Sequence, residues 1–284
     1  MKNGNNAYLW VLVAVAIVAV IGTVLKHEPS VSVKWHRVAM DGSRTGVSPV
    51  VAGNVDACLG IVEGEMYKAP NGRIYEGGSI VKVAESLISV QPRMERLKTK
   101  VGFSAREMRK KAPECELSDM FADAMRAKAS EVFGVPMDFA LTNFGGIRCD
   151  LPGGDILLED IESMFPFKNY LCWCTVRGEG LLRLFDQMAA NEKTPFQVIS
   201  GARVVLRDGK VVSSEIGGEP VDPSRLYNVA TIDFLLSGGD KIAVGAVSEK
   251  VELSTVLLKD VMLDYVQSRE VVDYETDGRV TVVE

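Results

Sequence analysis

The chain has 284 residues, of which 47% are hydrophobic and 25% are charged, and its formal net charge is −6. This length fits about two domains, and the apolar content is ample for a buried core. No block of lysine and arginine stands out along the sequence, which disfavours nucleic acid as a partner.

Residues 7–25, AYLWVLVAVAIVAVIGTVL, form an uncharged segment that begins at Ala7 and ends at Leu25. As a helix this segment would span about 28 Å, close to the thickness of a bilayer core. Lys2 also permits a cleaved signal peptide, although no A-x-A-like cleavage site follows. We therefore expect residues 1–27 to be a membrane anchor or signal segment that places the rest of the chain on the periplasmic or cell-surface side.

Residues 28–78 are rich in glycine, valine and proline and predict short strands and turns. A helical pattern follows from about Ser79 to Lys100. A second helix is predicted over residues 118–134, with Ser118 as its N-cap and a glycine at its end.

Strands and helices alternate in the remainder of the chain. The strands are predicted at DFALTNF (138–144), YLCWCTV (170–176), LYNVATIDFLL (226–236) and GRVTVV (278–283). The helices are predicted at DILLEDIESMFPF (155–167), EGLLRLFDQMAANE (179–192) and STVLLKDVMLDYVQ (254–267). FQVISGARVVLRDGKVVSSEI (196–216) predicts a hairpin with Asp208-Gly209 at its tip.

The five cysteines are an odd number, so at least one thiol has no partner within the chain. Cys172 and Cys174 flank Trp173 in an apolar strand, where small buried side chains are the expected role. A zinc site would need paired C-x-x-C spacings and histidines, but the histidines are His27 and His36, beside the apolar N-terminal segment. We expect no metal site in this chain.

Two Gly-Gly turns, NFGGIR (143–148) and SGGD (237–240), each follow an apolar strand. Such glycines let a ligand approach the backbone, although they are equally compatible with ordinary tight turns. The residues around them favour a ligand, because amide, guanidinium and carboxylate groups suit the polar edges of a nucleotide. These residues are Asn143, Arg148, Phe234 and Asp240, together with Phe167 and Asn169 of the intervening FPFKN segment.

The succession ECELSDMFADAM, NFGGIR, FPFKN, FQVISG, LYNVATIDFLLSGGD and DGRV resembles the C-terminal domain of the 5'-nucleotidase/UDP-sugar hydrolase family over residues 79–284. This resemblance implies an α+β fold with a mixed sheet and packed helices. It also implies that the domain binds the nucleoside part of a nucleotide, with the base between two aromatic rings.

The resemblance implies a role for each matched position. Phe167 and Phe234 match the stacking rings, Asp240 the ribose-binding aspartate, Arg148 the arginine of the GGIR turn, and Asn143 and Asn169 the asparagines that contact base or sugar. Lys111 falls where the family often has a further arginine, and it keeps the charge without the bidentate fork. One departure is that Lys241 and Ile242 follow GGD, where the family usually has glycine and an aromatic residue.

The second departure is larger. In the family, hydrolysis belongs to a separate N-terminal domain with two metal ions and motifs such as D-x-H and G-N-H-[DE], and residues 28–78 are far too short for it. A divalent metal pair would then belong to a separate metallophosphatase subunit, which this chain would complete as a membrane-tethered nucleotide-binding domain. The alternatives are a stand-alone nucleotide or nucleoside sensor, and a structural remnant with an unused pocket.

Overall fold

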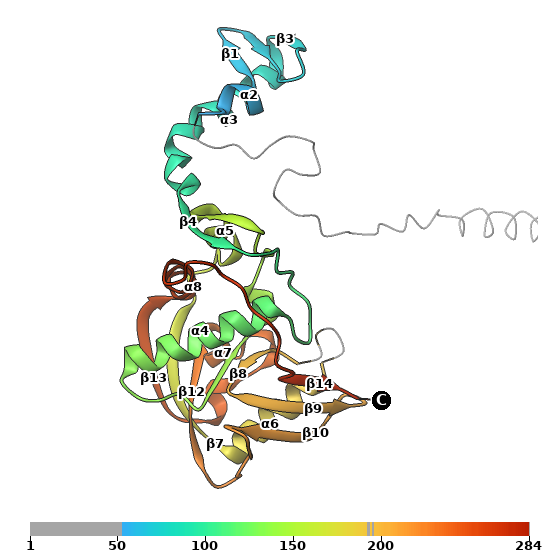
Figure 1. The fold of residues 1–284 in the computed structure, drawn as a ribbon, viewed down its shortest axis with the longest axis vertical. Helices are drawn as coiled ribbons and strands as arrows, with labels where there is room; N and C mark the ends of the chain where they lie inside the picture. Colours follow the sequence, from blue (N-terminus) through green and yellow to red (C-terminus); the bar gives the residue numbers. More distant parts are fainter. Residues whose placement is uncertain (1–52, 192–193, 195, 284) are drawn as a thin grey trace, which may run out of the picture. The chain divides into compact units, whose positions relative to one another are not determined.

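The computed structural model describes residues 53–191, 194 and 196–283 (Figure 1). The predicted membrane segment at residues 7–25 lies outside this range. Among the described residues, no helix combines the length and the apolar character that crossing a bilayer requires.

The first described elements form a small antiparallel sheet and a long helix. After α2 (Val55–Leu59), strands β1 (Ile61–Glu63), β2 (Met66–Lys68) and β3 (Ile74–Glu76) pair in the order β1-β2-β3. Helix α3 (Gly78–Met94) buries Val81 and Ala84, and the short 3-10 helix η2 (Glu95–Lys98) follows it. The helix predicted to reach Lys100 therefore ends earlier, because Lys100 begins a strand.

The central element is a mixed five-stranded sheet in the order β13-β7-β12-β5-β8. Its strands are β5 (Phe139–Thr142), β7 (Tyr170–Arg177), β8 (Val198–Ser200), β12 (Leu226–Ile232) and β13 (Ser248–Leu257). β5 and β12 run parallel, whereas the other neighbouring strands are antiparallel. Every residue of β5 is buried, as expected for a strand with both faces of its sheet covered.

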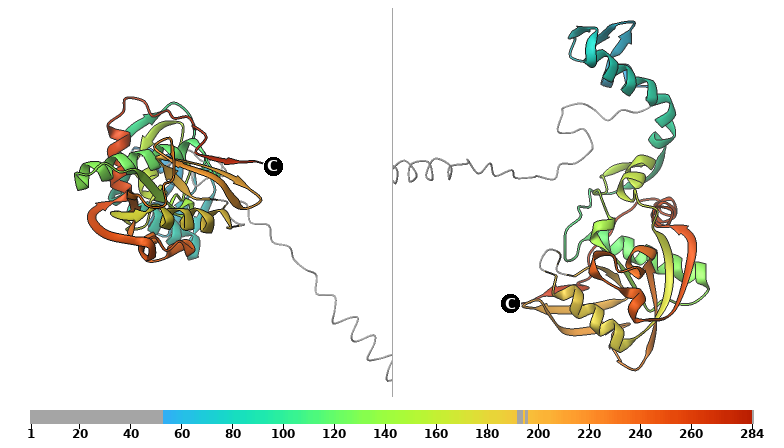
Figure 2. Two further views of the ribbon diagram at one scale, coloured as in Figure 1. Left: turned by 90° about the horizontal axis from the view of Figure 1, so that it is seen from below. Right: turned by 180° about the vertical axis from the view of Figure 1, so that it is seen from behind.

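Helices α4 (Glu116–Phe133) and α6 (Gly178–Ala189) pack against this sheet from its two sides (Figures 1 and 2). On the α6 side, the ring of Phe185 lies 5.5 Å from that of Phe139 and 5.7 Å from that of Phe196, and all three are fully buried. Helix α8 (Leu258–Gln267) packs on α4. The mixed α/β fold that the family resemblance implied is therefore confirmed.

Two further sheets complete the domain. β9 (Ala202–Arg207), β10 (Lys210–Ile216), β11 (Glu219–Pro220) and β14 (Val280–Val282) form a sheet in the order β11-β10-β9-β14. The predicted turn between β9 and β10 is confirmed, with positive φ at both Asp208 and Gly209. β4 (Lys100–Ser104) pairs with β6 (Gly154–Leu157), and α5 (Leu158–Met164) follows β6 directly.

Four further sequence predictions need correction. The strand predicted over residues 226–236 ends at Ile232, because residues 233–236 form the short helix α7 (Asp233–Leu236). The helix predicted from residue 155 begins only at Leu158, because residues 154–157 pair with β4. The helix predicted from residue 254 begins only at Leu258, because residues 248–257 extend the central sheet beside β7. Ser118 is the third residue of α4 rather than its N-cap, and its hydroxyl accepts a hydrogen bond from the Cys115 N–H at 3.1 Å.

A buried ion-pair network joins the C-terminal strand to α4. The guanidinium of Arg279, only 5% exposed, makes a bidentate pair with Asp123 at 2.7 and 2.9 Å, and its Nε lies 2.8 Å from Asp277. Asp119 Oδ2 lies 3.6 Å from the same Nε, and burial raises the pKa of Asp119 to about 8. The adjacent Glu114 accepts two backbone N–H bonds, from residues 278 and 280, and its pKa is lowered.

Candidate functional site

The two Gly-Gly turns meet at one edge of the central sheet. β5 and β12 are parallel neighbours, so their carboxyl ends lie together, and each turn follows one of these ends. Asn143 comes directly after β5, and Asp240 follows β12 by way of α7 (Asp233–Leu236). The Nδ2 of Asn143 donates a hydrogen bond to Asp240 Oδ2 at 2.5 Å.

The first pair of glycines is required by this contact. A Cβ at Gly145 would lie 3.1 Å from Asn143 Nδ2 and 3.4 Å from Asp240 Oδ2, and a Cβ at Gly146 would lie 2.9 Å from Asn143 Oδ1. The glycines therefore clear space for the protein's own amide and carboxylate. Asn143 Oδ1 is buried and has no hydrogen-bond partner among the described residues.

The second turn holds Asp240 in an unusual backbone conformation. Asp240 and Lys241 have φ values of 52° and 64°, in the left-handed region that residues other than glycine rarely occupy. Such strain is often found at functional sites. A Cβ at Gly239 would lie only 2.4 Å from the ring of Phe234, so this ring packs directly on the Gly239 backbone. The turn thus carries the Asp240 carboxylate and packs against the Phe234 ring.

Phe167 and Phe234 are partly open to solvent, with 49% and 40% of their surface exposed. The guanidinium carbon of Arg148 lies 5.7 Å from the centre of the Phe167 ring, and its Nη1 donates to the Gly145 carbonyl at 3.1 Å. Contacts therefore link Phe167 through Arg148 to the first turn. The Asn143–Asp240 hydrogen bond then links this turn to the second one, on which Phe234 packs. Phe167 and Phe234 are therefore half-exposed rings beside the two turns and not members of the core.

Asn169 and Lys111 are less closely integrated. Asn169 is half-buried immediately before β7, where its carbonyl accepts a bond from Leu258 N–H at 3.1 Å. Lys111 is exposed, and within the described chain it makes no hydrogen bond or ion pair. The neighbouring Lys110 instead donates through Nζ to the carbonyls of Phe144 and Ile147, and so braces the NFGGIR turn.

Two positioning residues were missed by the sequence analysis. Lys110 was missed because a lysine that binds backbone carbonyls carries no recognisable spacing. Asp233 accepts hydrogen bonds from the backbone N–H of Tyr170, at 3.1 Å, and of Phe234, at 2.9 Å. This carboxylate joins the segment after Phe167 to the start of α7. Its position directly before Phe234 was the available signal.

Cys172 and Cys174 lie in the core, and Cys149 lies beside the candidate site. All five are free thiols, and burial raises the pKa of Cys172 to about 12 and that of Cys174 to about 11. Both side chains are fully buried in β7, which confirms their role as small buried residues. Burial, reinforced by the charge of Asp150, also raises the pKa of Cys149 beside the NFGGIR turn, so that thiol stays protonated at neutral pH.

The described residues do not fit a two-metal centre. Glu114, Asp119 and Asp277 are the three acidic side chains in the described ranges with oxygens within 4.8 Å of one another. The Nε of Arg279 lies 2.8 Å from Asp277 and 3.6 Å from Asp119, so a guanidinium already supplies the positive charge that a metal would bring. Catalytic pairs of metal ions need a larger, uncompensated set of ligands.

Comparison with known proteins agrees with the geometry. The family described as 5'-nucleotidase, C-terminal domain, matches residues 94–246, more than half of the sequence. The chain therefore belongs to the 5'-nucleotidase C-terminal domain family. It is 31% identical to the protein UshA of Escherichia coli over 105 residues, which cover 36% of this chain and 19% of UshA. It is 30% identical to the cell wall protein Lmo0130 of Listeria monocytogenes over 186 residues, which cover 58% of this chain and 23% of that protein.

Solved structures show the same fold. A 5'-nucleotidase precursor from Thermus thermophilus superposes with a TM-score of 0.65 at 23% identity, over 72% of this chain and 43% of that one. The NAD nucleotidase NadN of Haemophilus influenzae gives a TM-score of 0.55 at 18% identity, over 76% and 47%. The chain thus spans about a fifth of the curated relatives named above and under half of these solved structures.

Proposed function

We propose that this chain is a membrane-tethered, extracytoplasmic domain that binds a nucleotide or nucleoside in nucleotide catabolism. In this proposal it supplies substrate binding to a separately encoded metallophosphatase subunit, which contributes the divalent metal pair. The observation that carries the binding role is the Asn143–Asp240 contact, which joins turns 97 residues apart beside two half-exposed aromatic rings. Family membership supports the class of ligand.

Each group has a matching part of the ligand. Half-exposed rings such as Phe167 and Phe234 stack on a base, which contributes roughly 1–3 kcal/mol per base. Asp240 has one carboxylate oxygen engaged by Asn143, and the carboxylate retains further acceptor positions for the hydroxyls of a ribose. Arg148 donates one N–H to the Gly145 carbonyl, so the other N–H donors of its guanidinium remain for phosphate.

A stand-alone nucleotide sensor is the second candidate function. The acidic cluster of the described residues lies against Arg279, and this agrees with either candidate. The two candidates share the same binding site and differ only in the partner. Restoration of hydrolysis by an added metallophosphatase subunit separates them.

The test is calorimetric titration of AMP and adenosine into the full chain. Phe167→Ala and Phe234→Ala should each raise the dissociation constant about 5- to 150-fold, the equivalent of losing one stacking face. Phe103→Ala is the matched control, because Phe103 is 39% exposed on β4, where its ring lies 5.6 Å from Lys100 Nζ and outside both turns of the site. Wild-type affinity in both site variants, with thermal melts confirming their fold, would show that the rings do not clamp a base.

A further inference from the structure

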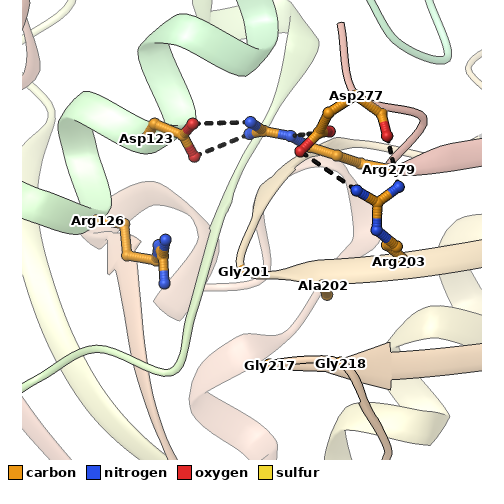
Figure 3. A pocket seen from close by; sticks show the side chains of 9 residues that line it. All are labelled: Asp123, Arg126, Gly201, Ala202, Arg203, Gly217, Gly218, Asp277 and Arg279. Carbon is orange, nitrogen blue, oxygen red and sulfur yellow. Dashed lines mark hydrogen bonds and ion pairs between the residues drawn. The ribbon is translucent and has the colours of Figure 1, made fainter.

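A cavity of about 200 Å³ lies outside the candidate nucleotide site (Figure 3). It is formed where α4, the turn between β8 and β9, the turn between β10 and β11, and the segment before β14 come together. Its charged lining residues are Asp123, Arg126, Arg203, Asp277 and Arg279. None of them is among the candidate site residues that the sequence indicates.

The lining carries a net positive charge. Three guanidinium groups face two carboxylates, which leaves one positive charge uncompensated. Both carboxylates are engaged by arginines of the lining. Asp123 is held by Arg279 at 2.7 Å, and Asp277 lies 2.8 Å from Arg279 Nε and 3.6 Å from Arg203.

Arg126 carries the uncompensated charge. Its guanidinium forms no hydrogen bond or ion pair with any residue that the structure describes, and its side chain points into the cavity (Figure 3). The side chain is half-buried on α4, so it is not an arginine free in solvent. A half-buried guanidinium without an acceptor loses hydration that nothing in the protein replaces.

The glycines around Arg126 keep the cavity open. A Cβ at Gly201 would lie 3.2 Å from Arg126 Nη1 and 2.3 Å from the Asp138 carbonyl, so a side chain there would displace the guanidinium. Gly217 and Gly218 form the opposite turn with positive φ, and a Cβ at either would point into open space. On this side of the cavity the wall is therefore glycine backbone, which leaves space beside the Arg126 guanidinium.

We propose that this cavity binds a small oxyanion, a phosphate or carboxylate group, through Arg126. Guanidinium groups bind both classes with two parallel hydrogen bonds. The cavity is smaller than the roughly 300–1,000 Å³ of typical ligand pockets, so it fits such a group rather than a whole nucleotide. The proposal does not depend on the nucleotide site.

The experiment titrates inorganic phosphate into the full chain, with chloride holding the ionic strength constant, and follows binding by calorimetry and ³¹P line broadening. Arg126→Gln should weaken phosphate binding about 10- to 100-fold, the size expected for charge-assisted hydrogen bonds. Arg126→Lys should lie between wild type and Arg126→Gln, because it keeps the charge without the fork. Arg183→Gln, on the exposed side of α6, is the charge-matched control and should bind as wild type.

Two further measurements identify the class of anion and the site at which it binds. Competition by acetate shows that the site accepts carboxylates, and its absence restricts the site to phosphate. Arg148→Ala separates this cavity from the nucleotide site. Loss of phosphate binding in Arg148→Ala but not in Arg126→Gln would overturn the proposal, as would absence of saturable binding up to about 20 mM phosphate.

Discussion

Gly239 determines where the Phe234 ring can lie. Because a Cβ at this position would approach the ring to 2.4 Å, Gly239→Ala must displace Phe234. We expect AMP affinity to fall in Gly239→Ala, within the roughly 5- to 150-fold range set by loss of one stacking face. The double variant Gly239→Ala/Phe234→Ala should bind no more weakly than Phe234→Ala alone, since both changes remove the same contact. Calorimetry that gives additive losses would contradict this.

Asp240 allows a test of ribose recognition that leaves the backbone undisturbed. Asparagine tolerates the left-handed conformation at φ 52°, so Asp240→Asn should keep the turn. The variant loses the ionised carboxylate, whose two oxygens can accept hydrogen bonds from the ribose hydroxyls. AMP affinity should therefore fall about tenfold more than that of the 2',3'-dideoxy analogue, measured side by side. An equal loss of affinity for the two ligands would show that Asp240 does not bind the ribose hydroxyls.

At the scale of elements, the helices and turns predicted from strong local sequence patterns agree with the structure. The Asp208-Gly209 turn and the body of α4 were predictable because turn chemistry and helical periodicity act over a few residues. β6 and β13 were not, since both are defined by pairing with distant strands and are continuous with the helices that follow them. A short apolar run before a helix carries no sign of such a partner.

The same distinction applies to the site. Residue types and order identified Asn143, Phe167, Phe234 and Asp240 as candidates through a family resemblance. The hydrogen bond between Asn143 and Asp240 depends on β5 lying beside β12, which no local pattern reveals. Resemblance also pointed to Lys111, whereas Lys110 is the lysine that binds the first turn. Contacts to backbone carbonyls leave no trace in residue spacing.

The carboxyl group of Asp119, which joins α4 to the Arg279 network, gives the fold a distinct dependence on pH. Its pKa is raised to about 8 in the folded chain, against about 3.9 when unfolded. The folded state therefore holds a proton that the unfolded state releases, and the contribution of Asp119 to stability falls as pH rises from about 4 to 8. Within this window the slope approaches about 1.4 kcal/mol per pH unit.

Asp119→Asn tests this dependence, because an amide imitates the protonated carboxyl. In urea unfolding from pH 5 to pH 8, the free energy of unfolding of the wild type should fall relative to that of the variant, by about 1.4 kcal/mol per pH unit. Glu114 and Asp123 have lowered pKa values, so their contributions are lost only at acidic pH and do not mask the comparison. A constant difference between the two proteins from pH 5 to 8 would show that Asp119 is ionised in the fold.

At the scale of the whole molecule, binding and hydrolysis are predicted to reside in different chains. The purified full chain should release no phosphate from AMP in the presence of Mg²⁺, Mn²⁺ or Zn²⁺, because its acidic cluster is occupied by Arg279. A malachite green assay measures this directly, and a chelator-treated sample is the control. Metal-dependent turnover that co-purifies with the chain through successive columns would place a catalytic centre within it.

The position of Arg279 has a consequence for biosynthesis. The carboxylate of Asp123 is built into α4 early in the chain, whereas the guanidinium that pairs with it comes from residue 279. A nascent polypeptide that stops before this residue leaves the Asp123 carboxylate without its bidentate partner and leaves β9 without its neighbour β14. The last strand therefore supplies both the partner of a half-buried charge on α4 and the neighbour of β9.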